Sequence, residues 1–300
     1  MEIDEIIQKL KELDLAIFPE SEIRELLNKI GTMASIKVTL HAGKSIMRAR
    51  PNYNGERFEK KTDYSFKPEE YNTTYQRAST PYQTMFYATF ISDKIEEGEL
   101  DNARLIAVAE TIPLLRDKEA SGYQKISFGR WYVKEDIHLI SVVHKDSYYK
   151  ESSYTRELVE AFKKVSETVD PILVEKSLKI QTFIADEFAK EIRDNYDYMI
   201  SAIFTETLLQ KFDGVFYPSV RAGGKGFNVA INPASMNKLE LQVAGECSLY
   251  KHKDHSYVSN DAIVELYGSE EEFNLINNEK QEEYILAKLG VSSVDELTQK

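Results

Sequence analysis

Three consecutive helical segments separate two groups of strand-like segments, and this order constrains the fold more than any other feature. Apolar residues recur at helical spacing through residues 155–169, 173–192 and 198–212. Short apolar or alternating runs bounded by turn residues come before and after these segments. A sheet that draws strands from both halves of the chain, covered by the helices, buries all of these apolar faces. The sequence therefore predicts an α+β fold.

The N-terminal region predicts two short amphipathic helices. They occupy residues 1–31, with a break near Pro19 and a stop at Gly31. The apolar faces consist of Ile3, Ile6, Ile7, Leu10 and Leu13 in the first helix and of Ile23, Leu26, Leu27 and Ile30 in the second. This spacing gives each helix one apolar side to pack against the rest of the protein.

From Ala34 the pattern changes to alternation, which predicts one strand that ends at Pro51. Arg48 and Arg50 lie two residues apart and so share one face of that strand. Residues 51–82 are rich in Asn, Thr, Tyr, Lys and Glu and are too long for an ordinary connection. We expect them to form a functional loop region.

The middle of the chain alternates between strands and a helix. Residues 84–90 predict a strand, residues 101–115 a helix, and residues 125–133 and 136–143 two further strands. These segments complete the group of strands that precedes the three helices.

After the three helices, residues 212–233 predict a strand, a glycine-rich turn and a strand, and residues 239–252 predict another strand. From about Ala262 the chain is rich in Glu and helical in character, and it ends in a short helix. We therefore expect three regions, namely a helical N-terminal segment (1–33), a main domain (34–245) and an accessory C-terminal segment (246–300).

Composition excludes several classes of protein. The 50 acidic and 38 basic side chains give a net charge of −12, which disfavours long nucleic acid but allows a small anionic substrate held by a few arginines. No apolar run is long enough to span a membrane and the first residues are acidic, so we expect a cytoplasmic protein without a membrane partner. Cys247 is the single cysteine, and His252 and His255 lack a third ligand at metal spacing. We expect no metal site.

The most unusual stretch is residues 213–228, in which Pro218 and Ser219 precede a turn with three glycines and then Asn228. The glycine spacing does not fit a dinucleotide-binding fingerprint or a phosphate-binding loop. The segment also lacks the G-x-S-x-G elbow of a hydrolase, with Pro218 directly before the serine and Val220 directly after it. A plain β-hairpin with glycines in its turn is the simplest interpretation.

The segment DGVFYPSVRAGGKGFNVAI resembles the C-terminal signature of the RES domain, a family named for Arg, Glu and Ser residues. Ser219 corresponds to the family's serine. Other landmarks follow in the family's order: an arginine in IMRARP, Arg77 in QRAS, Tyr87 in MFYA and Glu110 in AVAE. The resemblance covers roughly residues 36–245.

Two departures affect the assignment of the glutamate and of the second arginine. About ten extra residues, IEEGELDNAR, lie between Tyr87 and Glu110, so Glu97 and Glu99 compete with Glu110. The loop before the second arginine is longer than in the family, and Gln76 occupies a position where the family often has glycine.

The resemblance implies a mixed, split β-sheet similar to the ADP-ribosyltransferase fold, and an enzyme that degrades NAD by hydrolysis or phosphorolysis. NAD would be the substrate, without a further cofactor, and toxin members of the family are neutralised by an antitoxin that occludes the site. Two alternatives stay open, which are transfer of ADP-ribose to a macromolecule and a non-catalytic nucleotide-binding module. Three roles stay open for the N-terminal helices, which are a built-in regulator, the dimer surface of a homo-oligomer, and simple packing.

The residue types suit this chemistry. Guanidinium groups match phosphate oxygens in a two-pronged geometry, so Arg48, Arg50 and Arg77 suit the pyrophosphate of NAD, although each alone is also explained as a surface arginine. Breaking the bond to nicotinamide develops positive charge on the ribose, which the carboxylate of Glu110 would stabilise. Tyr87 either stacks on the nicotinamide ring or is a core tyrosine with a satisfied hydroxyl.

Ser219 and Asn228 are the remaining candidates. Together with the glycine-rich turn they present a hydroxyl, an amide and backbone N–H groups at one loop. Because no general base is evident beside it, Ser219 is expected to form hydrogen bonds in the site and not to act as a nucleophile.

Overall fold

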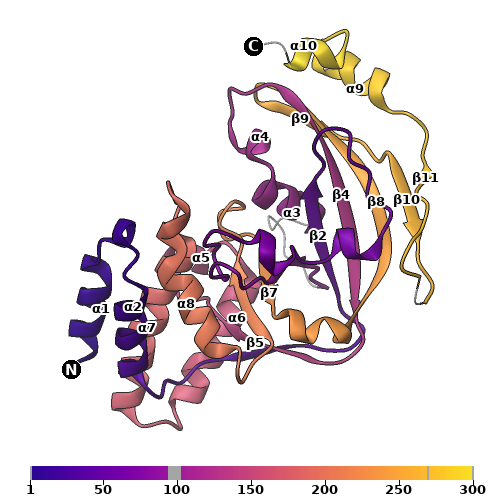
Figure 1. The fold of residues 1–300 in the computed structure, drawn as a ribbon. Coiled ribbons are helices and arrows are strands. Elements are labelled where there is room, and N and C mark those ends of the chain that lie inside the picture. Colours follow the sequence, from indigo (N-terminus) through magenta and orange to yellow (C-terminus); the bar gives the residue numbers. More distant parts are fainter. Residues whose placement is uncertain (1, 94–102, 269, 299–300) are drawn as a thin grey trace.

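A mixed sheet runs through the part of the chain that the computed structural model describes, which is residues 2–93, 103–268 and 270–298 (Figure 1). Its strand order is β1-β5-β6-β7-β3-β2-β4-β8-β10-β11, with β9 paired to β8. Among the described strands β5 and β6 pair in parallel and the other pairs are antiparallel. The strands are β1 (Lys37–Leu40), β2 (Ser45–Pro51), β3 (Phe86–Phe90), β4 (Gly122–Val133), β5 (Ile137–Ser141), β6 (Gly214–Pro218), β7 (Phe227–Ile231), β8 (Leu239–His252), β9 (His255–Val258), β10 (Ala262–Glu265) and β11 (Ile276–Asn277).

The predicted α+β class is confirmed, because the sheet is assembled from both halves of the chain. Strand β3 from the first half pairs with β7 from the second, and β4 pairs with β8 over twelve residue pairs. The helices are α1 (Ile3–Glu12), α2 (Glu20–Ile30), α3 (Ala103–Thr111), α4 (Pro113–Arg116), α5 (Asp146–Tyr149), α6 (Ser153–Ser166), α7 (Pro171–Ala189), α8 (Met199–Leu208), α9 (Glu282–Leu289) and α10 (Val294–Thr298).

The single strand expected from Ala34 to Pro51 is wrong, because the chain turns between Leu40 and Ser45. Gly43 in that turn has a φ of +99°, which favours glycine. Strand β1 pairs with β5, whereas β2 leaves the turn to pair with β3 and β4. Alternation continues through both strands, so the pattern alone could not show the turn.

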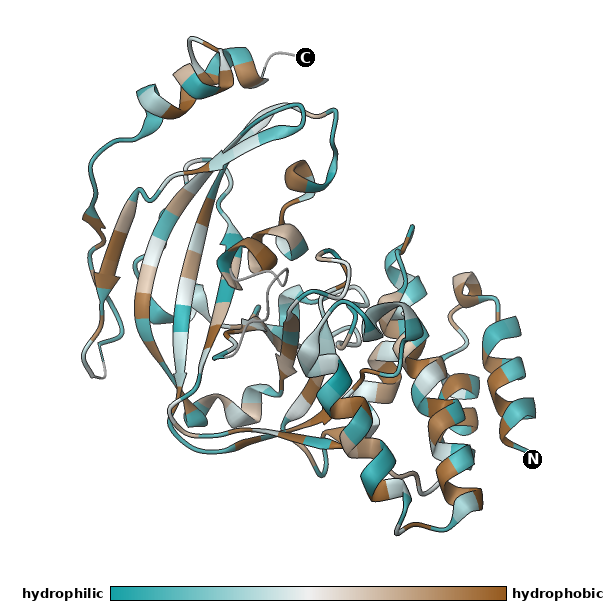
Figure 2. Ribbon diagram, turned by 180° about the vertical axis from the view of Figure 1, so that it is seen from behind, coloured by the Kyte–Doolittle hydropathy of each residue, from teal (hydrophilic) through white to brown (hydrophobic). Residues whose placement is uncertain are grey.

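The N-terminal helices form as predicted and join a helical layer. Helices α1 and α2 pack beside α7 and α8, and Figure 1 shows them as one group on one side of the sheet. Pro19 directly precedes α2 and Gly31, with a φ of +62°, ends it. The hydropathy colouring of Figure 2 shows brown and teal alternating along these helices, as expected when one side of each is buried.

The two faces of β6 define two core regions. Successive residues of a strand point to opposite faces. Val215 and Tyr217 therefore join the cluster beneath α7 and α8, whereas Phe216 packs in the opposite cluster with Leu158 of α6. The expectation that the three central helices cover the sheet is confirmed, with α6 on one face and α7 and α8 on the other.

Helices α3 and α4 cover a separate part of the sheet. Ala107, Val108 and Ile112 pack with Ala49 of β2 and with Ile126 of β4. The predicted helix over residues 101–115 is thus observed as two short helices with a break before Pro113, and residues 101 and 102 lie outside the described residues.

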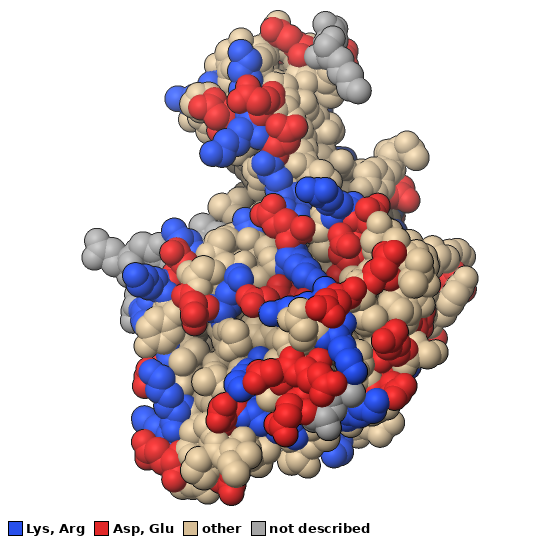
Figure 3. Space-filling model, turned by 90° about the vertical axis from the view of Figure 1, so that its left-hand side faces the viewer, with Lys and Arg blue, Asp and Glu red and all other residues tan. Residues whose placement is uncertain are grey.

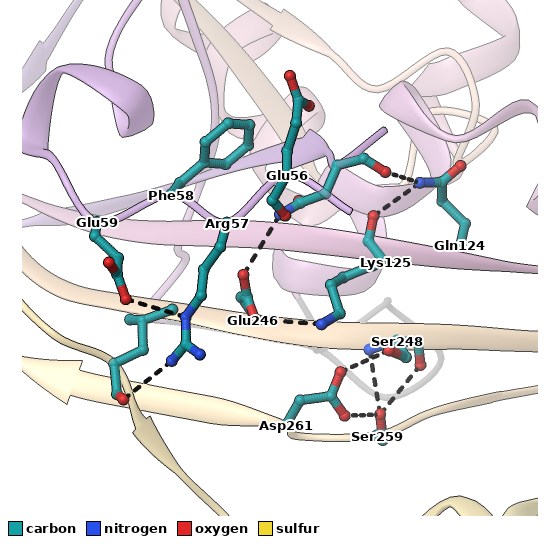
Figure 4. Close-up of polar contacts among 12 residues, drawn as sticks. Glu56, Arg57, Phe58, Glu59, Gln124, Lys125, Glu246, Ser248, Ser259 and Asp261 are labelled. Atoms are coloured by element: carbon teal, nitrogen blue, oxygen red, sulfur yellow. Dashed lines mark hydrogen bonds and ion pairs between the residues drawn. The ribbon is translucent and has the colours of Figure 1, made fainter. Parts of the chain in front are cut away.

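Residues 52–85 form the long irregular region that the composition predicts, with 3-10 helices η2 (Lys61–Tyr64) and η3 (Glu69–Tyr71). Side chains of the sheet hold its first part in place (Figure 4). Nε2 of Gln124 donates to the carbonyl oxygen of Asn52 at 2.7 Å, and Nδ2 of Asn52 lies 3.5 Å from Oε1 of the buried Glu246. Nζ of Lys125 lies 3.6 Å from Oε2 of the same carboxylate.

The C-terminal region differs from its predicted helical character. Residues 262–265 pair with β8 as strand β10, and β11 follows at the edge of the sheet. The pairing groups of β8 would otherwise be open on that side, so strand pairing overrides the helical composition of this short segment. Helices α9 and α10 come only afterwards and pack on Tyr250 of β8, and the boundary expected between residues 245 and 246 lies inside β8.

None of the described helices is long and apolar enough to cross a membrane.

Candidate functional site

A cavity opens where β2 and β3 separate. Strand β2 pairs with β4 along all seven of its residues but shares two described pairs with β3, Ile46 with Phe90 and Met47 with Thr89. The cavity beyond this point has a volume of about 420 Å³ and lies between the diverging strands, α3, and the segments that carry Arg77 and Tyr198. Six of the seven predicted site residues line it: Arg48, Arg50, Arg77, Tyr87, Glu110 and Asn228. The seventh, Ser219, is not among the lining residues but is hydrogen-bonded to Glu110.

Arg48 spans the gap between the strands. Its Nη1 donates to the main-chain carbonyl of Tyr87 at 2.8 Å, and its guanidinium carbon lies 5.4 Å from the centroid of the Phe86 ring. Burial and the neighbouring Arg50 lower the pKa of Arg48 to about 10, so the group still carries its charge at neutral pH. Nε of Arg48 is buried and has no hydrogen-bond partner among the described residues.

Arg50 lies nearer to solvent. Its guanidinium carbon is 4.2 Å from the centroid of the Phe58 ring, and its Nη1 donates to the carbonyl oxygen of Asp63 at 3.2 Å. The two arginines share one face of β2, as predicted, and both line the cavity.

Arg77 is held in a tight turn of the irregular region. Gln76 and Ser79 exchange two main-chain hydrogen bonds around it. Its side chain is buried, with Nη2 donating to the hydroxyl of Tyr198 at 3.0 Å, while Nη1 has no partner among the described residues. A buried, unpartnered guanidinium nitrogen at a cavity wall is a position that an anionic ligand can satisfy.

Glu110 is the centre of a hydrogen-bond network. Its Oε1 accepts from Oγ of Ser219 at 2.6 Å, from Nδ2 of Asn228 at 3.0 Å, and from the backbone N–H of Arg221 at 3.3 Å. Oγ1 of Thr89 donates to Oδ1 of Asn228 at 3.0 Å, which directs the amide nitrogen of that residue to the carboxylate. The network fixes the orientation of the carboxylate.

The glycine-rich turn positions Ser219. Strands β6 and β7 pair up to Pro218 and Phe227, and the turn between them closes by a bond from the N–H of Gly224 to the carbonyl of Ser219 at 2.8 Å. Oγ of Ser219 donates to Glu110 and accepts from the N–H of Ala222 at 3.2 Å. The serine is fully buried, and its hydroxyl serves as a link between the turn and the carboxylate.

Of the two interpretations of Tyr87, the structure shows the satisfied hydroxyl. Its OH accepts from the N–H of Ala78 at 3.0 Å and lies 2.8 Å from Oγ of Ser79, and burial raises the pKa of Tyr87 to about 12. These bonds hold the turn that carries Arg77 against β3. Tyr87 therefore supports Arg77, and its stacking on a ligand ring stays a prediction.

Several lining residues were not predicted from sequence. Arg116, Tyr198, Arg221 and Tyr217 also face the cavity. Arg221 and Tyr217 lie in the same motif as Ser219, two residues away on either side, which is a signal that the sequence did contain. Nothing local distinguishes Arg116 and Tyr198 from surface residues, because only the folding of α4 and α8 brings them to the cavity.

The lining is strongly basic in an acidic protein. Five arginines line the cavity (Arg48, Arg50, Arg77, Arg116 and Arg221), and among the described lining residues Glu110 is the one carboxylate. This difference is a formal charge of +4 within a chain of net charge −12. Figure 3 shows acidic and basic side chains interspersed over one face of the molecule, without a broad basic tract. The arrangement favours a small anion over a long polyanion.

The competing candidates Glu97 and Glu99 lie outside the described residues. The described residues contain no group of three or more His, Cys, Asp or Glu side chains placed to hold a metal ion.

Comparison of the chain with protein-family models and with curated proteins gives no match in either case.

Proposed function

We propose that the protein cleaves the bond between nicotinamide and ribose in NAD. The observation that carries the proposal is the carboxylate of Glu110, held by three donors at the wall of a cavity lined by five arginines. The arginines suit the pyrophosphate, and the carboxylate suits a ribose that becomes cationic. The resemblance to the RES domain, whose landmark residues gather at this cavity, points to the same substrate.

The chemistry needs little from the protein beyond binding and electrostatics. When the C–N bond breaks, its electron pair passes to the nicotinamide ring, which leaves as a neutral molecule and needs no proton. The positive charge that develops on the ribose is stabilised by the Glu110 carboxylate, whose orientation Ser219 and Asn228 fix in advance. Water then forms a bond to the same carbon and loses one proton to solvent, giving ADP-ribose, or hydrogen phosphate forms that bond as an anion, giving the 1″-phosphate.

The test is product analysis of the purified protein with NAD, with and without inorganic phosphate, by chromatography and mass spectrometry. We expect nicotinamide together with ADP-ribose or ADP-ribose 1″-phosphate, which identifies the acceptor. Glu110→Gln should lower turnover at least about a hundredfold, because a neutral amide does not stabilise the cation as a carboxylate does. Glu160→Gln is the matched control, since Glu160 is an exposed carboxylate of α6 that pairs with Lys163 and does not line the cavity.

Three outcomes would contradict the proposal or change it. Near-wild-type turnover by Glu110→Gln would remove the role of this glutamate. A protein or nucleic acid labelled with ADP-ribose would show that the acceptor is a macromolecule. Intact NAD after prolonged incubation, with binding measured by calorimetry, would show a nucleotide-binding module.

A further inference from the structure

The turn that carries Arg77 is held from outside by the N-terminal helix pair, defined here as α1, α2 and the connection between them. Arg77 itself contacts Tyr198, which directly precedes α8. Residues between Phe18 and Leu27 contact the turn that carries Arg77 and the short helix that carries Tyr198. Three independent contacts make this connection.

The first contact is polar. Nη2 of Arg24 in α2 donates to Oε2 of Glu206 in α8 at 2.8 Å, and the same carboxylate oxygen lies 3.4 Å from Oγ1 of Thr80. The single hydroxyl proton of Thr80 is donated either to this carboxylate or to Oε1 of Gln83, which lies 3.1 Å from the same Oγ1. The contact therefore reaches the segment that follows Arg77. The Glu206 carboxylate thus joins α2 to the Arg77 turn.

The second contact is aromatic. Phe18, which ends the 3-10 helix η1 (Leu15–Ile17), lies edge-on to Tyr196 with ring centroids 6.0 Å apart. Tyr196 belongs to the 3-10 helix η4 (Asn195–Tyr198), whose last residue is Tyr198. The connection between α1 and α2 thereby buttresses the short helix that presents Tyr198 to Arg77.

The third contact is the core beneath the turn. Tyr75 and Ala78, on either side of Arg77, are buried in the same apolar cluster as Ile23 and Leu26 of α2. Arg77 therefore sits on a base made partly by the N-terminal helices, and its charged side chain projects from that base toward the cavity.

We infer that the N-terminal helix pair is a positioning element for Arg77, acting through Glu206 and through Tyr198. This inference rests on the proposed function for its kinetic readout, because Arg77 is assigned there to the pyrophosphate. Arg24 and Phe18 are positioning residues, since they act on Arg77 through other side chains. The pair thus has a role in ligand binding beyond packing.

The test uses the 300-residue chain with the substitution Arg24→Gln. The KM for NAD should rise about threefold to fivefold, the size expected for a partly exposed ion pair, with kcat within twofold of wild type. Arg24→Lys should recover part of the loss because it restores the charge. In a Glu206→Gln background, Arg24→Gln should have no further effect if Arg24 acts through that carboxylate.

Lys29→Gln is the matched control, because it removes the charge and the ion pair with Glu25 from the exposed side of the same helix. Phe18→Gly is a second variant that removes the ring and suits the left-handed backbone at this position, where φ is +53°. A KM in Arg24→Gln and Phe18→Gly equal to that of Lys29→Gln would overturn the inference.

Hydrogen exchange separates this inference from the proposed function. The amides of residues 72–83 should exchange faster in Arg24→Gln than in Lys29→Gln, whether or not the protein turns over NAD. Unchanged exchange in that segment would overturn the positioning role. Failure of wild-type protein to cleave NAD or to bind pyrophosphate in calorimetry would instead count against the proposed function alone.

Discussion

Oε1 of Glu110 receives hydrogen bonds from three residues of one segment: Ser219 directly after β6, the backbone of Arg221 in the following turn, and Asn228 in β7. Glu110 comes from α3, more than a hundred residues earlier. A carboxylate with this many donors on one oxygen has little freedom to rotate, so the orientation of the charged group is fixed before any ligand binds.

Ser219→Ala should give a folded protein with about tenfold lower kcat for NAD cleavage and a nearly unchanged KM. The substitution removes one charge-assisted hydrogen bond to Glu110 and leaves two. Steady-state kinetics measures both constants. Mass spectrometry of wild-type protein trapped during turnover should find no ADP-ribosyl adduct on Ser219, and such an adduct would make the serine a nucleophile.

Arg77→Lys should raise the KM for NAD about tenfold with a smaller loss in kcat. Lysine keeps the charge but loses the planar fork that bonds to Tyr198 and that we propose to bond to phosphate oxygens at the same time. Arg57→Lys is a suitable control, since Arg57 pairs with Glu59 and the carbonyl of Leu275 and does not line the cavity. Equal KM values for the two variants would place Arg77 outside the ligand site.

The cavity depends on strand β2, which separates from its neighbour β3. Strand β2 follows β4 along its whole length and separates from β3 after Met47, and the side chain of Arg48 bonds to a β3 carbonyl in the gap. The cavity is therefore a consequence of sheet divergence, with the arginines of β2 on one wall and the β6–β7 turn on the other.

Gly224→Ala tests the shape of that turn. Gly224 has a φ of +87°, and a Cβ there would lie 2.6 Å from Cδ1 of Tyr148, so both backbone strain and a steric clash follow. Gly223→Ala is the matched control, because its φ is +64° but nothing lies within 4 Å of its Cβ.

Urea unfolding should show a loss of about 1–2 kcal/mol for Gly223→Ala, from strain alone. Gly224→Ala should lose at least about 1 kcal/mol more, because of the clash with Tyr148. Equal losses in the two variants would mean that Tyr148 moves aside without cost.

The stability of the whole protein depends on titratable side chains that stay neutral inside the core, such as the imidazole of His144. His144 follows β5, is buried, and lies edge-on to Phe162 of α6 with ring centroids 4.9 Å apart. Burial lowers the pKa of His144 to about 4, against a small opposing effect of Asp146. The unfolded chain therefore binds a proton at a higher pH than the folded chain does.

Stability should consequently fall as the pH drops from about 6.5 toward 4, where the unfolded imidazole is protonated and the folded one is neutral. The loss from this group is at most about 3 kcal/mol, from a shift of roughly two and a half pH units. Urea unfolding of wild type and His144→Gln at pH 7.5 and pH 5 measures it. The free-energy difference between the two proteins should shrink at pH 5, and a constant difference would contradict the prediction.

Local patterns were sufficient for the elements whose structure is set by near neighbours. Apolar spacing located α1, α2, α7 and α8, Pro19 and Gly31 marked the limits of α2, and the Pro-Ser-glycine motif located the β6–β7 turn. These features depend on contacts a few residues apart. Of the seven residues predicted for the site, the fold brings six to one cavity and places Ser219 in hydrogen-bond contact with Glu110. Their chemical roles stay predictions.

Tertiary structure decided the features that depend on which distant strand becomes a neighbour. The turn at Gly43 separates β1 from β2 because each finds a different partner, and residues 262–265 become β10 because β8 has an open edge beside them. Tyr198 reaches the cavity because α8 packs under the sheet. In each case the deciding free energy comes from strand pairing or burial between segments far apart in sequence, which local periodicity does not contain.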